Sequence, residues 1–277
     1  MPRAYEPCLT RTVLAVSVRN CHSGHMTTEE FTWGELDEAS ATKARDTIVH
    51  ALDVANLAAY YRRRGNYAGS TFTDIQPNEP YDLTASDLHA VSMMAVTVQP
   101  AATRRLLEPS MLREVVLHAL AHVPVDVRLE DADESQMQRA WNLQMALKEA
   151  LAPYDAKKSN CWITAAKISA RKRPLLIPVR DKVVGRALGP VAHKDAGVYW
   201  QLMAAALRDP AVQEALVKAQ ERVETSVFSG KWGSETGKEL GPVELETNPM
   251  RLIDVALWMA HTKGRAVVLE PEEVVNE

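Results

Sequence analysis

Apolar residues recur at intervals of three and four along most of the chain, which is the spacing of helices with one buried face. Helix-capping side chains precede these stretches, and glycine or proline follows them. The pattern predicts helices over residues 42–64, 84–95, 110–120, 134–151, 159–173, 181–188, 198–207, 210–227 and 249–263. We therefore expect a mostly α protein, with a single compact multi-helix domain over residues 41–277.

Several predicted helix starts carry a specific signal. Thr84 is followed by Asp87 at the third helical position, the arrangement of a capping box. Asp209 precedes Pro210, a pair that suits a cap and a first helical residue. Asp181 stands at the start of its helix in the same way. Trp141, Trp200 and Trp258 lie at helical spacing with other apolar residues, so we expect them in the core.

Strand signals are confined to the two ends of the chain. Residues 11–18 alternate between apolar and polar, and residues 265–269 form a short apolar run. We expect at most a small β element there, with residues 1–40 forming an N-terminal extension. Residues 229–246 are rich in Gly, Ser, Lys and Glu and show neither period. Loops of this length are usually functional or mobile.

Composition places the chain among ordinary globular proteins, with 46% apolar and 25% charged residues in 277. No run of 18 apolar residues occurs, and the apolar segment 13–18 is too short for a signal peptide. The three cysteines show no disulfide or metal spacing. We expect a cytoplasmic, monomeric protein with no membrane partner, no metal and no cofactor. The cluster Cys21, His22 and His25 is better explained as a polar turn than as a metal site.

Charge changes this picture most. Residues 157–194 contain ten basic residues and one acid, a net charge of +9, although the whole chain carries −4. A positive field confined in this way is typical of a face that binds a polyanion. The acid is Asp181, whose ionised form the surrounding cations favour.

The segment around Asp181 has a defined order of elements. A basic helix ends at Pro174, an apolar connector follows, and Asp181 begins the next helix. Pro178 fixes its own φ and biases Ile177 toward an extended conformation, so the connector is stiff. Asp181 then either caps its helix and does nothing more, or presents a carboxylate at a fixed position among cations.

This segment resembles the helix–hairpin–helix DNA glycosylases over about 30 residues, through Pro174, Pro178, Val179, Asp181, Val183, Leu188 and Gly189. In that superfamily a hairpin and a basic helix hold the DNA backbone, and a Pro-Val-Asp-like segment delivers the catalytic aspartate. Two features depart from the family. Lys158–Trp162, at the hairpin position, lacks glycine, and Lys167 lies several residues from the place of the lysine found in lyase-competent members. The segment also resembles small actinobacterial proteins of unassigned function.

The resemblance implies a monofunctional enzyme that hydrolyses the N-glycosidic bond of a damaged or modified base flipped out of duplex DNA. Asp181 is the expected catalytic residue, with Asp155, Asp195 or Asp254 as replacements if it only caps a helix. The expected base pocket consists of Tyr154, Trp162, Tyr199 and Trp200. The expected nucleic-acid contacts are Lys157, Lys158, Lys167, Arg171, Lys172, Arg173, Arg180, Lys182 and Arg186.

Two other readings of the same residues stay open. One is a non-enzymatic helical protein that binds nucleic acid or a protein partner through the basic face. The other is an enzyme that acts on small phosphorylated substrates. For Arg171, Lys172 and Arg173 a solvated helix end is the plain alternative, since the helix dipole favours cations there.

Overall fold

The computed structural model describes residues 30–33, 36–62, 67–153, 161–228 and 243–262. Contacts divide the chain into residues 1–30 and residues 31–277, and every described helix belongs to the second unit. The described residues form twelve α-helices and two short 3₁₀ helices, with no β-sheet, which confirms the predicted mostly α fold.

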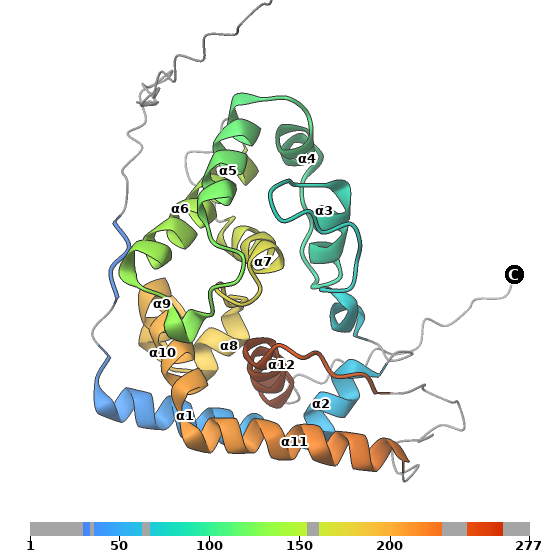
Figure 1. Ribbon diagram of the computed structural model, residues 1–277, viewed down its shortest axis with the longest axis vertical. Helices are drawn as coiled ribbons and strands as arrows, with labels where there is room; N and C mark the ends of the chain where they lie inside the picture. The colour runs from blue at the N-terminus through green and yellow to red at the C-terminus, as the bar shows by residue number, and fades with distance from the viewer. Residues whose placement is uncertain (1–29, 34–35, 63–66, 154–160, 229–242, 263–277) are drawn as a thin grey trace, which may run out of the picture. The chain divides into compact units, whose positions relative to one another are not determined.

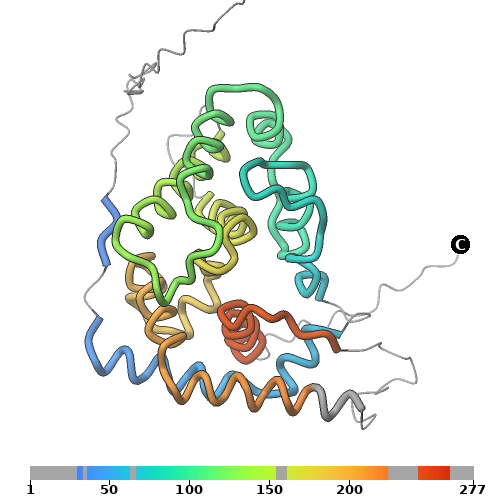
Figure 2. The backbone as a smooth tube through the Cα atoms, in the orientation of Figure 1, coloured from blue at the N-terminus to red at the C-terminus, as the bar shows by residue number. Residues whose placement is uncertain are grey.

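Figures 1 and 2 show the order of the helices along the chain. Their bounds are α1 Glu38–Ala51, α2 Val54–Tyr61, α3 Ala85–Ser92, α4 Pro100–Leu107, α5 Met111–His122, α6 Glu134–Leu151, α7 Trp162–Lys172, α8 Lys182–Ala187, α9 Pro190–Lys194, α10 Ala196–Arg208, α11 Pro210–Phe228 and α12 Pro249–Thr262. The 3₁₀ helices are η1 Ala68–Thr71 and η2 Leu129–Asp131.

Helices α3 and α5 begin where the capping signals predict. The capping box of Thr84 and Asp87 starts α3, and the Ser110 hydroxyl accepts a hydrogen bond from the Arg113 amide at the start of α5. The prediction of a single helix over residues 42–64 is wrong. Asp53 accepts a hydrogen bond from the Ala55 amide and so starts a second helix, which divides the segment into α1 and α2.

Part of the prediction lies outside the described residues. Both expected strands, 11–18 and 265–269, lie there, as do residues 229–242 of the long loop and the Cys21, His22 and His25 cluster. Within the described ranges an isolated antiparallel bridge joins Arg62 and Val243.

The helical unit begins about ten residues before the expected boundary at 40/41. Phe31 is buried, and its ring lies 5.3 Å from that of Trp200 and 5.9 Å from that of Trp141. Its amide donates a hydrogen bond to Gln138 of α6 at 2.7 Å. An apolar residue with three such contacts belongs to the core, which explains why the unit starts at residue 31.

Helix α7 packs against α6 and against α3 (Figure 1). The last turn of α7 is buried. Arg171, Lys172 and Arg173 at this end are at most 3% exposed. Lys172 Nζ lies 3.0 Å from Oδ2 of Asp87, and Arg171 Nε lies 3.3 Å from Oδ1 of the same carboxylate. One buried carboxylate on α3 therefore holds two cations of α7.

The remaining donors of these cations bind backbone carbonyls. Arg171 Nη1 donates to the carbonyls of Phe72 and Thr73 at 2.7 and 2.9 Å, and its Nη2 donates to that of Ile75. Arg173 donates to the carbonyls of Pro80, Leu120 and Val123 at 2.7–2.9 Å. A buried cation is tolerated when its donors are satisfied in this way. The end of α7 therefore contacts α3, the segment 72–80 and the end of α5, and holds them together.

The connector that follows α7 is fixed from both sides. Leu176, Ile177 and Val179 are buried. The Ile177 amide donates to the Arg173 carbonyl at 2.9 Å, and the Tyr199 hydroxyl of α10 donates to the Val179 carbonyl at 2.6 Å. The predicted stiff connector therefore leads directly from the buried basic residues to Asp181 at the head of α8.

This arrangement predicts that replacing Asp87 strongly lowers the stability of the protein. In the Asp87→Ala variant, Arg171 and Lys172 lose their counterion inside the protein, and the α3 capping box loses the hydrogen bond that the Thr84 amide donates to Asp87. We expect the free energy of unfolding to fall by about 3–5 kcal/mol, the usual cost of breaking a buried ion pair. Chemical denaturation measures this change. Asp74→Ala, which removes an exposed acid from the neighbouring segment, should change stability by less than about 0.5 kcal/mol. Equal effects of the two substitutions would contradict the buried network.

Candidate functional site

Asp181 caps α8. Its Oδ1 accepts a hydrogen bond from the Val183 amide at 2.8 Å. Its side chain is 21% exposed, so the carboxylate is held by the backbone but remains open on one side. The cap predicted from the sequence is confirmed, and one carboxylate oxygen is left for other contacts.

Lys167 of α7 points at the same place. Its Nζ lies 3.9 Å from Oδ2 of Asp181 and donates a hydrogen bond to the Met94 carbonyl at 2.6 Å. The side chain is 6% exposed. Burial lowers the pKa of this lysine, and the charges of Asp181 and Asp254 act in the opposite direction. A desolvated amine beside a carboxylate is typical of functional sites.

Helix α12 contributes a second pair of charges. Arg251 Nη1 donates to Oδ2 of Asp254, and Arg251 Nη2 donates to the Tyr60 hydroxyl at 2.8 Å. Burial raises the pKa of Asp254 to about 6; Arg251 opposes this shift, and the charge of Asp181 adds to it. The site therefore combines an open carboxylate with a buried carboxyl group whose pKa is raised above its ordinary range.

These four charged groups line one cavity of about 500 Å³. Its other walls include Tyr60, Tyr67 and Trp258. The rings of Tyr60 and Tyr67 are stacked at 5.4 Å, and those of Tyr67 and Trp258 meet edge to face at 5.8 Å. We call this space the aromatic cavity. Its size and its mixture of aromatic walls with few polar groups are those of a small-molecule site.

A second cavity of about 330 Å³ shares Asp181 and Ile163 with the aromatic cavity. Its remaining side chains come from α6, α7, the connector and the segment from α8 to the start of α10: Trp141, Trp162, Arg180, Lys182, His193, Lys194 and Ala196. We call it the cationic cavity. Asp181 thus stands where two spaces of different chemical character adjoin.

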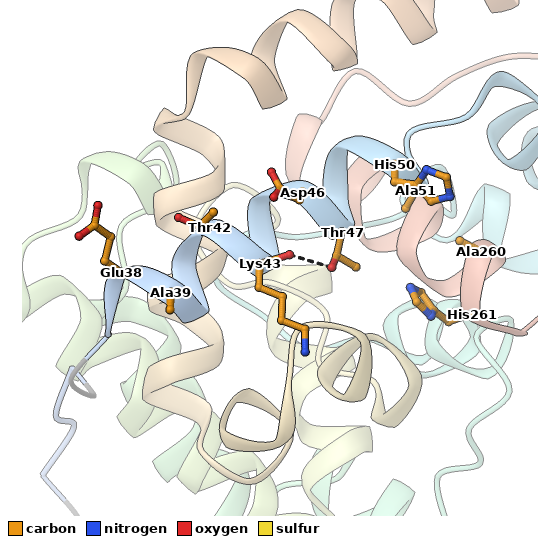
Figure 3. Close-up of a pocket in the computed structure, with 10 residues that line it drawn as sticks. All are labelled: Glu38, Ala39, Thr42, Lys43, Asp46, Thr47, His50, Ala51, Ala260 and His261. Atoms are coloured by element: carbon orange, nitrogen blue, oxygen red, sulfur yellow. Dashed lines mark hydrogen bonds between the residues drawn. The ribbon is translucent and has the colours of Figure 1, made fainter.

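A wider and more open depression of about 1080 Å³ lies along α1 (Figure 3). It is lined by α1 residues from Glu38 to Ala51, with Ala260 and His261 from the end of α12. The Thr47 hydroxyl donates to the Lys43 carbonyl within it, as the dashed line in Figure 3 marks. Its polar side chains are mostly exposed and spread along the helix, so they do not converge on one point, unlike those around Asp181.

Three of the predicted nucleic-acid contacts are wrong. Arg171, Lys172 and Arg173 are buried against Asp87 and backbone carbonyls, so none of them faces a surface that DNA can reach. Lys167 lines the aromatic cavity, and its contact with nucleic acid stays a prediction. Of the others, Lys182 and Arg186 are exposed, Arg180 is half-buried, and Lys157 and Lys158 lie outside the described residues.

The predicted base pocket is also largely wrong. Tyr199 and Trp200 are fully buried in the core, Tyr199 by its bond to the connector and Trp200 by contact with Phe31 and Trp141. Trp162 is half-buried and lines the cationic cavity, and Tyr154 lies outside the described residues. Trp258, expected in the core, instead forms a wall of the aromatic cavity.

Sequence reasoning missed Tyr60, Tyr67 and Arg251 and named Asp254 only as a replacement carboxylate. One signal was present. Arg251 and Asp254 are two opposite charges three residues apart in a helix whose other residues from Met250 to Met259 are mainly apolar. Charges on a buried helix need a partner, and they often mark a site.

Fold and site together define a helical protein with a charged, aromatic-walled cavity next to a cationic one. The chain belongs to a family of unknown function, DUF6308, whose sequence model matches residues 53–261. That span contains Asp87 and every residue that lines the two cavities. No curated protein and no solved structure matches the chain.

No helix among the described residues is long and apolar enough to cross a membrane. No group of three or more His, Cys, Asp or Glu side chains in the described ranges is placed to hold a metal ion.

The state of Asp254 is testable through stability. Its carboxyl group has a higher pKa in the folded protein, about 6, than the ordinary aspartate value of 3.8. The protonated group therefore stabilises the fold below about pH 4, and this contribution is lost as the pH rises through about 6. The unfolding free energy of the parent minus that of Asp254→Asn should fall over this range, by at most about 3 kcal/mol.

Chemical denaturation at a series of pH values measures this difference. Asn keeps an acceptor for Arg251, so the variant should fold. A difference that does not fall between pH 4 and 7 would mean that Arg251 holds Asp254 ionised throughout this range, which contradicts the raised pKa.

Proposed function

We propose that the protein is a DNA glycosylase that hydrolyses the N-glycosidic bond of a damaged or modified base and acts as a monofunctional enzyme on a base flipped out of the duplex. The observation that carries the proposal is the position of Asp181. This half-open carboxylate, held rigidly as a helix cap, lines a cavity of about 500 Å³ that has three aromatic walls. A flat heterocycle with polar edges matches such walls, since aromatic faces stack on bases.

The chemistry of the bond explains why a carboxylate is needed. As the bond between the base and the sugar breaks, positive charge develops on the sugar, and a nearby carboxylate stabilises it. Water then adds its hydroxyl to the sugar carbon, and its proton goes to the base. Asp181 is suited to the electrostatic part, and Asp254 in the same cavity, whose pKa is raised to about 6, is suited to exchange a proton with the leaving base.

A second candidate is the same reaction on a free nucleoside or nucleotide. It is favoured by the burial of Lys167, Arg171, Lys172 and Arg173, which leaves fewer cations at the surface than the sequence suggests. A small substrate needs few phosphate contacts, whereas duplex DNA is usually held by many.

Asp181→Asn tests the proposal. Asn caps a helix about as well as Asp, so we expect a stability cost of a few tenths to about 1 kcal/mol. Base release should fall about 100-fold or more, because an amide lacks the charge that stabilises the transition state. Asp209→Asn is the matched control: Asp209 caps α11 through the Ala211 amide and lies in neither cavity. It should leave base release unchanged.

The assay uses a panel of duplexes with damaged or modified bases, followed by alkali, and a parallel panel of nucleosides and nucleotides analysed for free base. Strand breaks that appear only after alkali indicate a monofunctional glycosylase. Free base from the small substrates alone would select the second candidate. An Asp181→Asn variant with parental base release would reduce Asp181 to a helix cap.

A further inference from the structure

The cationic cavity has a strongly uneven charge. Arg180, Lys182 and Lys194 line it together with His193, and its acidic residue is Asp181, which is shared with the aromatic cavity. This contrasts with the buried end of α7, where Asp87 and several carbonyls satisfy the cations. The cavity therefore holds positive charge that the protein itself does not neutralise.

Arg180 shows this most clearly. Its side chain is half-buried, and its one hydrogen bond to a described residue runs from Nη2 to the His193 carbonyl at 3.2 Å. Burial lowers the pKa of Arg180, and the charges of Tyr199 and Asp195 act in the opposite direction. A guanidinium has five N–H donors in a planar fork that suits the oxygens of a phosphate. Most of these donors are available to a ligand.

Lys182 and Lys194 add further positive charge to the lining of the cavity. Both are exposed, and neither has an ion pair with any residue in the described ranges. They come from two helices that meet tightly. A Cβ added at Gly185 of α8 would lie 3.2 Å from the His193 Cα of α9, a contact closer than packed side chains normally allow. The two lysines are thus placed on a preformed wall.

Trp162 is not free to bind a base in this cavity. Its ring lies 5.4 Å from that of Trp141, and Lys148 Nζ lies 4.0 Å from its centroid. With the indole engaged by the protein, the groups left for a ligand are cationic. The ligand expected here is therefore an anion rather than a second aromatic ring.

The two cavities adjoin at Asp181, and a nucleotide has a matching order of parts. Its sugar joins a base on one side to a phosphate ester on the other, and the bond to be broken lies between them. We propose that the cationic cavity binds the phosphate ester attached to the sugar of the excised nucleotide, through Arg180, Lys182 and Lys194. This inference rests on the proposed function and adds a phosphate site separate from the basic helix.

Direct binding to the full-length protein tests the site without any need for catalysis. The probes are inorganic pyrophosphate, deoxyguanosine 5′-monophosphate and a short duplex with one tetrahydrofuran abasic site, each measured by calorimetry at low salt. The test variant is Lys182→Gln/Lys194→Gln. The control is Lys218→Gln/Arg222→Gln, which removes the same charge from exposed positions on α11. Circular dichroism should show that both variants fold.

We expect the test variant to bind pyrophosphate and at least one of the other probes about tenfold more weakly or worse, which is about 1.4 kcal/mol, and the control to bind within about twofold of the parent. If the test variant binds the duplex more weakly but binds the monophosphate as the parent does, the natural ligand is a phosphate of the DNA backbone. If it also binds the monophosphate more weakly, the natural ligand is a free nucleotide. Equal binding by the two variants overturns the proposal, as does a parent that binds none of the probes. Since base release is not measured, failure of the phosphate site and failure of the glycosylase proposal are distinguishable.

Discussion

The arrangement of this protein depends on a buried ionic contact between two helices. Asp87 of α3 holds Arg171 and Lys172 of α7, and Arg173 binds the carbonyl ends of α5. Three cations with one carboxylate are costly to bury unless carbonyls satisfy the other donors, which they do here. Because the connector to Asp181 begins at the next residue, the position of the carboxylate is fixed by this contact.

Helix α7 also contributes a side chain to the site. One turn before the buried cations, Lys167 reaches Asp181, so α7 fixes the connector at its end and supplies a charged group to the cavity. Helix α12 supplies Arg251 and Asp254 from the other direction. Groups that belong to packed helices lose little freedom when a ligand binds, which favours precise placement. The basic stretch is therefore divided between internal support and the lining of the cavities.

Local signals made much of the fold predictable. Capping residues such as Ser110, Asp181 and Asp209 lie where the structure begins helices, because a cap is decided by neighbours in sequence. The break at Asp53 and the short helices α4 and α9 were missed. The site was less predictable. Arg171–Arg173 has the pattern of a solvated helix end, and its burial depends on Asp87, 84 residues from Arg171. No local period reports a partner at that distance.

Lysine reactivity tests most directly whether the basic stretch is divided in this way. The native protein is treated with an amine-acetylating reagent at low stoichiometry, and the modification of each lysine is followed by mass spectrometry. Lys182 and Lys194, which are exposed, should react at the rate of exposed lysines such as Lys218. Lys167 and Lys172, at most 5% exposed, should react only after denaturation. Native modification of Lys172 at the rate of Lys182 would contradict the buried contact with Asp87 and the placement of Asp181 that depends on it.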